Sequence, residues 1–203
     1  MLPSLQQTKE LFKFITSVTD EQNVSNNLPK GTSRRHYQNV AFIASRIAGY
    51  SGLNVEKAFI LGLLHDYGEY IEASTPETFH GTAGYDEMMR LGYDDVARTC
   101  LSHSFFDDNF KPEDFPAYDK KQIIRAAELL KERPFDDYDR LIHLADMMAP
   151  RDKIDTIENR IAMITEKYNL PAAVALRKKR EALWLKDYFD SLTERNVYTL
   201  IGL

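Results

Sequence analysis

One short stretch of the chain places two ionisable side chains directly after an apolar run. Residues 61–66 read LGLLHD, so His65 and Asp66 follow four residues that suit a buried helix. Burying an ionisable group is costly unless another group pairs with it. Imidazole is the commonest metal ligand among side chains, and one carboxylate can bind two metal ions through its two oxygens. The pair therefore indicates a site that holds a divalent cation.

The other histidines and one aspartate could complete such a site. His36, His80 and His103 fall where a predicted helix begins, ends or turns. Asp146 lies in LIHLADMMAP, on an apolar helix face where an isolated carboxylate would be unfavourable. His143, in the same segment, is interpreted as a pocket-lining or hydrogen-bonded residue rather than a ligand. A divalent cation would stabilise the buried charges together.

The order of these residues and their local contexts resemble a known family. The contexts read RRH, LLHDYGE, FHGTAG, SHS and HLADMMA, in that order along the chain. This is similar to the HD superfamily of metal-dependent phosphohydrolases in its six-ligand form, H…HD…H…H…D, and the similarity spans roughly residues 33–150. The resemblance implies one metal held by four residues and a second held by three, with Asp66 shared: His36, His65, Asp66 and Asp146 for the first, and Asp66, His80 and His103 for the second.

The resemblance also implies the chemistry of the site. Two metal ions would activate a water for hydrolysis of a phosphate ester or anhydride of a small metabolite, and we expect a nucleotide. Mixed nitrogen and oxygen ligands with open positions suit iron or manganese, our first choice, or cobalt or nickel, better than a closed tetrahedral zinc site. Magnesium and zinc are further alternatives.

Other residues are candidates for proton transfer and substrate binding. Glu69 in HDYGE resembles the glutamate of HD-type 5′-deoxynucleotidases, so we expect it to act with Asp66 in catalysis, although an ordinary solvated carboxylate is the alternative. Many HD phosphodiesterases have lysine there, which disfavours a cyclic dinucleotide. Arg34, Arg35 and Arg151 lie near predicted ligands and could bind phosphate, as could the pocket-lining His143. Arg34 and Arg35 could equally lie on a solvated helix face.

Two other functional classes stay open from the pattern alone. HD-type mixed-valent di-iron oxygenases use the same ligand set, so the pattern does not separate a hydrolase from an oxygenase. A non-catalytic ligand-binding module with the same fold is a third interpretation, which an intact ligand set disfavours.

These side chains must be positioned by helices. Apolar residues recur at intervals of three and four, strand alternation is absent, and the pattern predicts a single all-α HD-type helical bundle over residues 1–203. Ser33 and Asn54 are the expected caps of two long helices. An N-terminal helix and a C-terminal helical hairpin flank the motif core. The predicted helices are 8–18, 34–50, 55–71, 80–90, 94–103, 119–131, 137–149, 154–168 and 171–191, and residues 197–203 should dock on the body.

The composition of the chain limits the kinds of binding partner that we expect. The chain has 203 residues, a net charge of −5 and a pI near 5.6, which disfavours nucleic-acid binding and leaves a small phosphorylated substrate as the expected partner. The single cysteine, Cys100, precludes an intrachain disulfide, and no apolar run is long enough for a membrane span. We therefore expect a cytoplasmic protein without membrane contact, and a homodimer is compatible with the sequence. The basic stretch 177–180 is interpreted as a solvated helix face, and the aromatic segment 105–118 as a lid or a packed connector.

Overall fold

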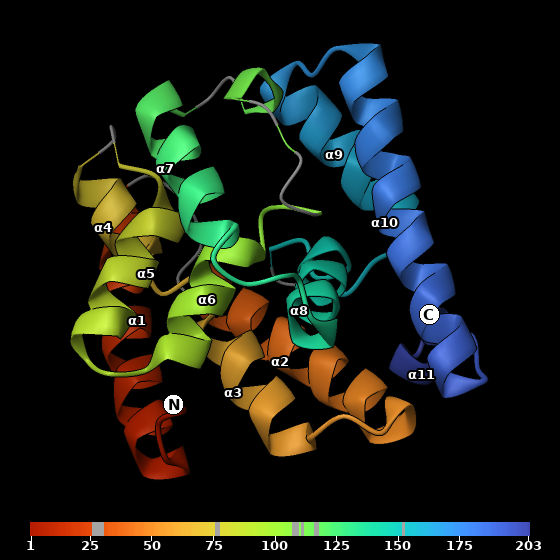
Figure 1. Ribbon diagram of the computed structural model, residues 1–203, viewed down its shortest axis with the longest axis horizontal. Helices are drawn as coiled ribbons and strands as arrows, with labels where there is room; N and C mark the ends of the chain where they lie inside the picture. Colours follow the sequence, from red (N-terminus) through yellow and green to blue (C-terminus); the bar gives the residue numbers. More distant parts are fainter. Residues whose placement is uncertain (26–30, 76–77, 107–109, 111, 116–117, 152) are drawn as a thin grey trace.

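The structure is a computed structural model that describes residues 1–25, 31–75, 78–106, 110, 112–115, 118–151 and 153–203. Within these residues the secondary structure is helical and contains no strand, which confirms the predicted all-α class (Figure 1). The elements are α1 (Leu5–Ser25), α2 (Thr32–Ser51), α3 (Val55–Leu64), α4 (Glu69–Ser74), α5 (His80–Arg90), α6 (Asp94–Ser102), the 3-10 turn η1 (Pro112–Asp114), α7 (Lys120–Leu130), α8 (Asp137–Met147), α9 (Ile157–Tyr168), α10 (Ala172–Thr193) and α11 (Val197–Ile201).

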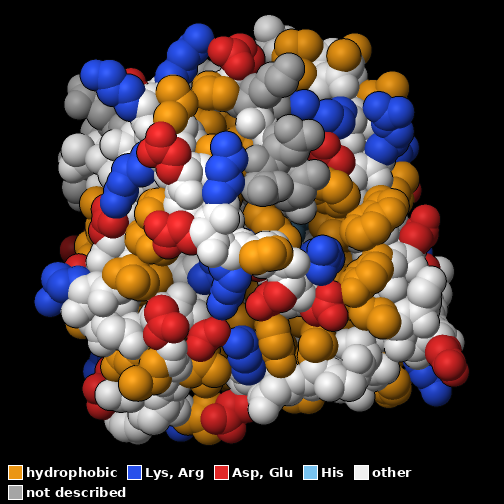
Figure 2. Space-filling view, viewed as in Figure 1, with side chains coloured by type: hydrophobic (Ala, Val, Ile, Leu, Met, Phe, Trp, Pro, Cys, Tyr) orange, Lys and Arg blue, Asp and Glu red, His pale blue; other side chains and the backbone are white. Residues whose placement is uncertain are grey.

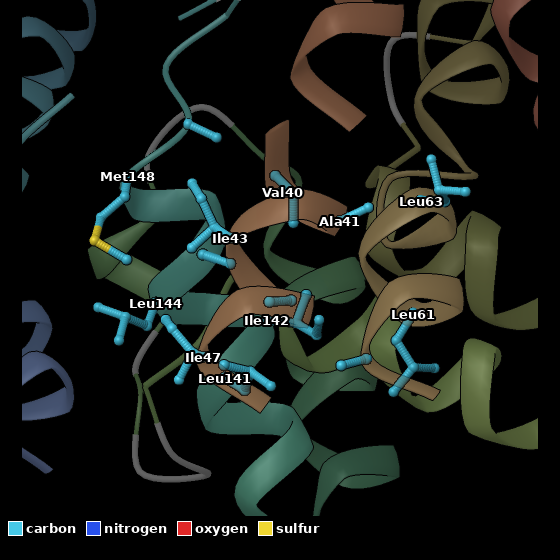
Figure 3. Close-up of a cluster of buried hydrophobic side chains, with 14 of the residues drawn as sticks. Val40, Ala41, Ile43, Ile47, Leu61, Leu63, Leu141, Ile142, Leu144 and Met148 are labelled. Carbon is cyan, nitrogen blue, oxygen red and sulfur yellow. The ribbon is translucent and has the colours of Figure 1, made fainter. Parts of the chain in front are cut away.

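Three helices form the centre of the core. α2, α3 and α8 pack against one another, and their apolar side chains interdigitate (Figure 3). The buried positions of α2 recur every three or four residues, so one face of the helix is apolar. α3 is apolar nearly all round because it is covered on several sides, by α1, α2, α6 and α8. Figure 1 shows α4 and α5 on one side of this centre and the α9–α10 hairpin on the opposite side.

The helix starts confirm one predicted cap and overturn another. The Asn54 side chain accepts a hydrogen bond from the Lys57 N–H at 2.8 Å and caps α3 as predicted. Ser33 does not cap α2, because the helix already begins at Thr32 after Gly31, whose φ of 81° only glycine adopts easily. The Ser33 hydroxyl instead accepts a hydrogen bond from the Asn23 side chain of α1 at 3.0 Å.

The predicted continuous helix over 55–71 is wrong. α3 ends at Leu64, a turn covers residues 65–68, and α4 begins at Glu69. The break coincides with close packing at Gly68, where an added Cβ would lie 2.0 Å from the His80 carbonyl oxygen and 2.5 Å from the Gly84 nitrogen. Only glycine allows this approach of the 65–68 turn to α5, which brings Asp66 toward His80.

The ends of the chain are held by the same core. α1 extends to Ser25, beyond the predicted end at residue 18, and the C-terminal hairpin forms as α9 and α10. α11 buries Val197, Leu200 and Ile201, which confirms that the last residues dock on the body. Among the described helices, none combines the length and apolar character that a membrane span requires.

The aromatic segment 105–118 packs in its described part. Phe105 stacks on Phe110 at 3.8 Å between ring centroids and meets Phe115 edge-on at 4.9 Å. These rings join a second apolar cluster with Phe79 and with residues of α6 and α7. The contacts support the packed-connector interpretation, and the lid interpretation stays a prediction that falls partly on residues outside those described.

Candidate metal centre

The six predicted ligands lie at or near helix ends that meet in one place. His36 is in the second turn of α2, His65 and His103 directly follow α3 and α6, and His80 opens α5. Asp66 is in the turn after α3, and Asp146 is in the last turn of α8. A helix end leaves the direction of a side chain less constrained by neighbouring turns. Six positions spread over more than a hundred residues therefore converge on one centre.

Asp66 lies between two pairs of histidines. Its Oδ2 is 3.4 Å from the Nε2 atoms of both His36 and His65, which we call the first pair. Its Oδ1 is 3.5 Å from the Nε2 of His80 and 3.0 Å from that of His103, which we call the second pair. Each carboxylate oxygen thus faces a different pair, the arrangement that a carboxylate shared between two cations requires.

Main-chain oxygens orient the rings of the first pair. The Nδ1 atom of His36 lies 2.7 Å from the Ala149 carbonyl oxygen, and the Nδ1 atom of His65 lies 2.9 Å from that of Gly62. A carbonyl oxygen only accepts hydrogen bonds, so each Nδ1 carries the hydrogen and each Nε2 can present a lone pair to the centre. This outer hydrogen bonding is typical of histidines that bind metals.

In the second pair, a carboxylate orients one of the two rings. Glu72 Oε2 accepts hydrogen bonds from the ring Nδ1 of His80 at 2.6 Å and from its backbone N–H at 2.9 Å. The Nδ1 of His103 lies 3.2 Å from the Thr99 carbonyl oxygen. The Ser104 hydroxyl lies near both inward nitrogens, 3.4 Å from the Nε2 of His80 and 3.2 Å from that of His103. Both rings of this pair also turn Nε2 toward Asp66.

The donor set fits divalent cations. The inward nitrogens of the first pair are 3.2 Å apart, and those of the second are 3.3 Å apart. Two lone pairs at such distances repel unless a cation or a proton lies between them. In each of two groups, His36–His65–Asp66 and Asp66–His80–His103, one donor atom per residue lies within 4.8 Å of the others. The centre therefore offers two adjoining sets of nitrogen and oxygen donors.

The carboxylates keep the centre charged. Burial lowers the pKa of His36 and of His80, but neighbouring carboxylates outweigh it and raise both values to about 9. Burial raises the pKa of Asp66, yet the surrounding histidines hold it well below its usual range. Burial and Asp66 also raise the pKa of Glu69, whose carboxylate accepts a hydrogen bond from the buried Tyr37 hydroxyl. The centre can therefore hold protons or cations at neutral pH, and the raised pKa of Glu69 favours its protonated form.

Asp146 completes the first set and has a cationic neighbour. Its Oδ1 lies 3.4 Å from the Nε2 of His36 and 3.9 Å from that of His65. Arg160 of α9 places an Nη2 atom 4.0 Å from the same oxygen. Burial raises the pKa of Asp146, but Arg160 and the two histidines lower it below the usual value.

The centre opens into a cavity of about 670 Å³. His143 and Arg151, both predicted to bind substrate, line this cavity, and so does Glu69. Burial lowers the pKa of His143 to about 4, so its ring is neutral at pH 7. The remaining walls carry aromatic side chains from the 105–118 segment and basic side chains from α9 and α10. The basic residues are Arg160, Lys167, Arg177 and Lys178.

Two predicted substrate ligands are not brought to this cavity. Arg34 and Arg35 are exposed and do not belong to its lining, and the Arg34 guanidinium lies over the Phe12 ring at 5.9 Å. Successive helical residues point about 100° apart, so residues one and two positions before His36 face away from a centre that His36 faces. This geometry supports the alternative of a solvated helix face. The interpretation of 177–180 as such a face is wrong for Arg177 and Lys178, which line the cavity.

Sequence reasoning missed two residues that the structure places in the centre. Glu72 was not singled out because its role depends on the break after α3, which the periodicity does not show. Arg160 lies beyond the last motif, and a single arginine in an amphipathic helix carries no local signal. The distribution of charge on the surface does not single out either residue, because acidic and basic side chains are interspersed on the face shown in Figure 2.

Comparisons with known proteins give one match. The HD domain family matches residues 34–151, more than half of the chain, and the match includes the six residues of the centre. No curated protein and no solved structure matches the chain.

Proposed function

Since this chain belongs to the HD domain family of metal-dependent hydrolases, we propose that it hydrolyses a phosphate ester or anhydride of a small metabolite, with a nucleotide as the expected substrate. The observation that carries the proposal is Asp66, whose two oxygens face two separate pairs of inward-directed imidazoles. Such a donor set suits two cations that share one carboxylate.

The six residues would hold iron or manganese, with cobalt, nickel, magnesium and zinc as alternatives. When bound, the cations supply Lewis acidity, which activates a water and neutralises charge on a phosphoryl group. The protein's own part is to fix the ligands. The Ala149 and Gly62 carbonyl oxygens and the Glu72 carboxylate hold three of the imidazoles in one tautomer and one orientation.

Glu69 is the proposed proton donor to the leaving group. Glu69 lines the cavity, and its backbone N–H donates to the Asp66 carbonyl oxygen at 2.9 Å. This hydrogen bond ties Glu69 to the turn that carries the shared ligand Asp66. Burial and the nearby Asp66 raise its pKa, which favours the protonated form that an acid catalyst needs. The Tyr37 hydroxyl fixes one carboxylate oxygen and leaves the other for the substrate.

The cavity supports a small substrate with an apolar, flat part. Its volume of about 670 Å³ lies in the range of small-molecule sites. Phe110, Phe115 and Tyr118 line its wall, and aromatic side chains of this kind can pack against a nucleobase. Arg151 and the basic residues of the hairpin offset the charge of a phosphate.

The test is release of inorganic phosphate under strict anaerobiosis. The protein is loaded with Mn, Fe, Co or Ni, its metal content is measured, and nucleotides and other phosphorylated metabolites are screened. We expect turnover that Asp66→Ala abolishes and that Arg180→Gln, an exposed residue outside the cavity, leaves unchanged. Dioxygen consumption by the partly reduced iron form with polyols or phosphonates, without phosphate release from any phosphorylated compound, would contradict the proposal and favour the oxygenase.

A further inference from the structure

Two residues near Asp146 each have a buried nitrogen atom without a hydrogen-bond partner among the described residues. These atoms are Nδ1 of His143, one turn before Asp146 on α8, and Nε of Arg160, on α9. Both residues line the cavity of the metal centre. A buried polar atom without a partner is unfavourable, and such atoms in a native structure call for an explanation.

The metal centre itself does not explain these two atoms. His143 stands outside both groups of candidate ligands. Arg160 cannot bind a cation, because a guanidinium stays protonated and has no lone pair to offer. Its contact with Asp146 is long, 4.0 Å from Nη2, and leaves Nε unused. Both groups suit an oxygen that enters the cavity beside Asp146.

We propose that Arg160 and His143 form an oxyanion subsite beside Asp146, which binds oxygens of the substrate's phosphoryl group. This inference rests on the proposed function and makes it more specific. The planar guanidinium donates from Nε and Nη together, the geometry that two phosphate oxygens match. The neutral His143 ring has a single N–H, for which the Phe105 backbone is the competing acceptor, and it donates from Nδ1 in the tautomer that carries the hydrogen there.

The subsite narrows the substrate class to terminal phosphoryl groups. The Arg160 fork donates to two oxygens, and cations held by the two adjoining donor sets would take at least one more. A terminal phosphoryl group, as in a monoester or at the end of an anhydride, has three non-bridging oxygens, whereas an internal diester has two. Arg160 lies outside the matched family region of 34–151 and comes from the α9–α10 hairpin. The hairpin of this chain thus supplies the discrimination between a monoester and a diester.

The first test measures binding of inorganic phosphate, not turnover. Manganese-loaded wild type, Arg160→Gln and the matched control Arg180→Gln are titrated with phosphate in a calorimeter, and the metal content of each is measured. We expect Arg160→Gln to bind phosphate about 10- to 100-fold more weakly at unchanged metal content, with Arg180→Gln like wild type. Equal affinity in Arg160→Gln, no phosphate binding by wild type, or a loss of affinity that follows a loss of metal would overturn the inference.

Two further variants test the geometry and guard against a folding defect. Arg160→Lys retains the charge but lacks the fork, so its phosphate affinity should lie between those of wild type and Arg160→Gln. His143→Leu should weaken phosphate binding, whereas His143→Gln, which can still donate, should restore part of it. Equal affinities for the leucine and glutamine variants would remove His143 from the subsite.

Turnover then separates this inference from the proposed function. A monoester such as p-nitrophenyl phosphate should lose more kcat/KM in Arg160→Gln than the diester bis(p-nitrophenyl) phosphate does. Equal losses for the two compounds would overturn the assignment to terminal phosphoryl groups. If no phosphate compound is turned over while Arg160-dependent phosphate binding persists, the proposed function fails and the oxyanion subsite stands.

Discussion

The two histidine pairs face the same carboxylate, but the protein holds them in different ways. In the first pair, His36 and His65 rest on main-chain carbonyl oxygens, and His65 is completely buried. Their helices, α2 and α3, form the centre of the core. In the second pair, His103 also contacts a main-chain carbonyl oxygen, at the longer distance of 3.2 Å. His80, however, is held by the side chain of Glu72, which comes from the six-residue helix α4.

This difference indicates which pair of histidine rings is already held in its metal-binding orientation before a metal binds. A buried main-chain oxygen cannot turn away, whereas a side-chain carboxylate must itself be ordered before it can order a ring. We therefore expect the first pair to bind metal more tightly than the second. Single substitutions should separate the two halves, and the following predictions run from the largest expected effect to the smallest.

Asp66→Asn should remove both metal sites at once, and with them the difference in metal affinity between the two histidine pairs. The amide can present only one oxygen, so it cannot serve both pairs, and the histidines lose the charge that offsets bound cations. We expect loss of both metals and a fall in activity of about 10³-fold or more, because metal catalysis supplies several kcal/mol. Elemental analysis and phosphate release measure these effects. Retention of two metals by this variant would contradict the shared-carboxylate geometry.

Gly68→Ala should damage the second pair selectively. The added Cβ would lie 2.0 Å from the His80 carbonyl oxygen, so α5 must shift and carry His80 with it. We expect a loss of about 1–3 kcal/mol in the free energy of unfolding, typical of overpacking, together with loss of the second metal only.

The control for this variant is Gly49→Ala. A Cβ at that helical position meets only the Val55 side chain at an ordinary 3.8 Å, so neither stability nor metal content should fall. Denaturant unfolding and elemental analysis compare the two variants. If Gly68→Ala keeps both metals, the close packing of the turn on α5 does not position His80.

The metal centre and the helices around it show how much of the structure can be predicted from the sequence. The helical period predicts the all-α class and most helix positions, since a buried apolar face leaves a local pattern. The types and order of His36, His65, Asp66, His80, His103 and Asp146 predict that a common centre exists, and the structure brings these side chains together.

What escaped prediction depends on contacts between distant segments. Residues 65–71 keep a helical pattern, so the break at Gly68 appears only once α5 packs on the turn. The break in turn begins α4, which carries Glu72 to His80. Arg160 reaches Asp146 only because the hairpin folds back on α8. Each of these residues has no signal within its own stretch of sequence.

Glu72→Gln should weaken the second site without a change in packing. The amide keeps the size of the carboxylate but removes the charge that polarises and orients the His80 ring. Substitution of such outer partners lowers metal affinity about 10- to 100-fold. Metal titration should therefore show one unchanged site and one weakened site.

Glu87→Gln, on α5 but paired with Arg90, is the matched control and should leave both sites unchanged. Equal weakening of both sites in Glu72→Gln would contradict the separate support of the two pairs.

Proton release on metal loading gives the finest test of the comparison. Carboxylates raise the pKa of His36 and of His80 to about 9 in the metal-free protein, so both rings are imidazolium ions, with a proton on each nitrogen, at pH 8. Metal must displace these protons, and metal affinity should therefore rise with pH until the pH passes about 9. Calorimetry in buffers of different ionisation enthalpy should show about two protons released at pH 8, one from each pair.

In Glu72→Gln this release should fall below two protons, because the charge of Glu72 no longer raises the pKa of His80 and only Asp66 and Glu69 still raise it. His36 keeps its own carboxylates, Asp66 and Asp146, and should still release its proton. The variant thus measures the second pair against the first within one molecule. Release of about two protons by both proteins would show that Glu72 does not set the protonation of His80, and that the two pairs are supported alike.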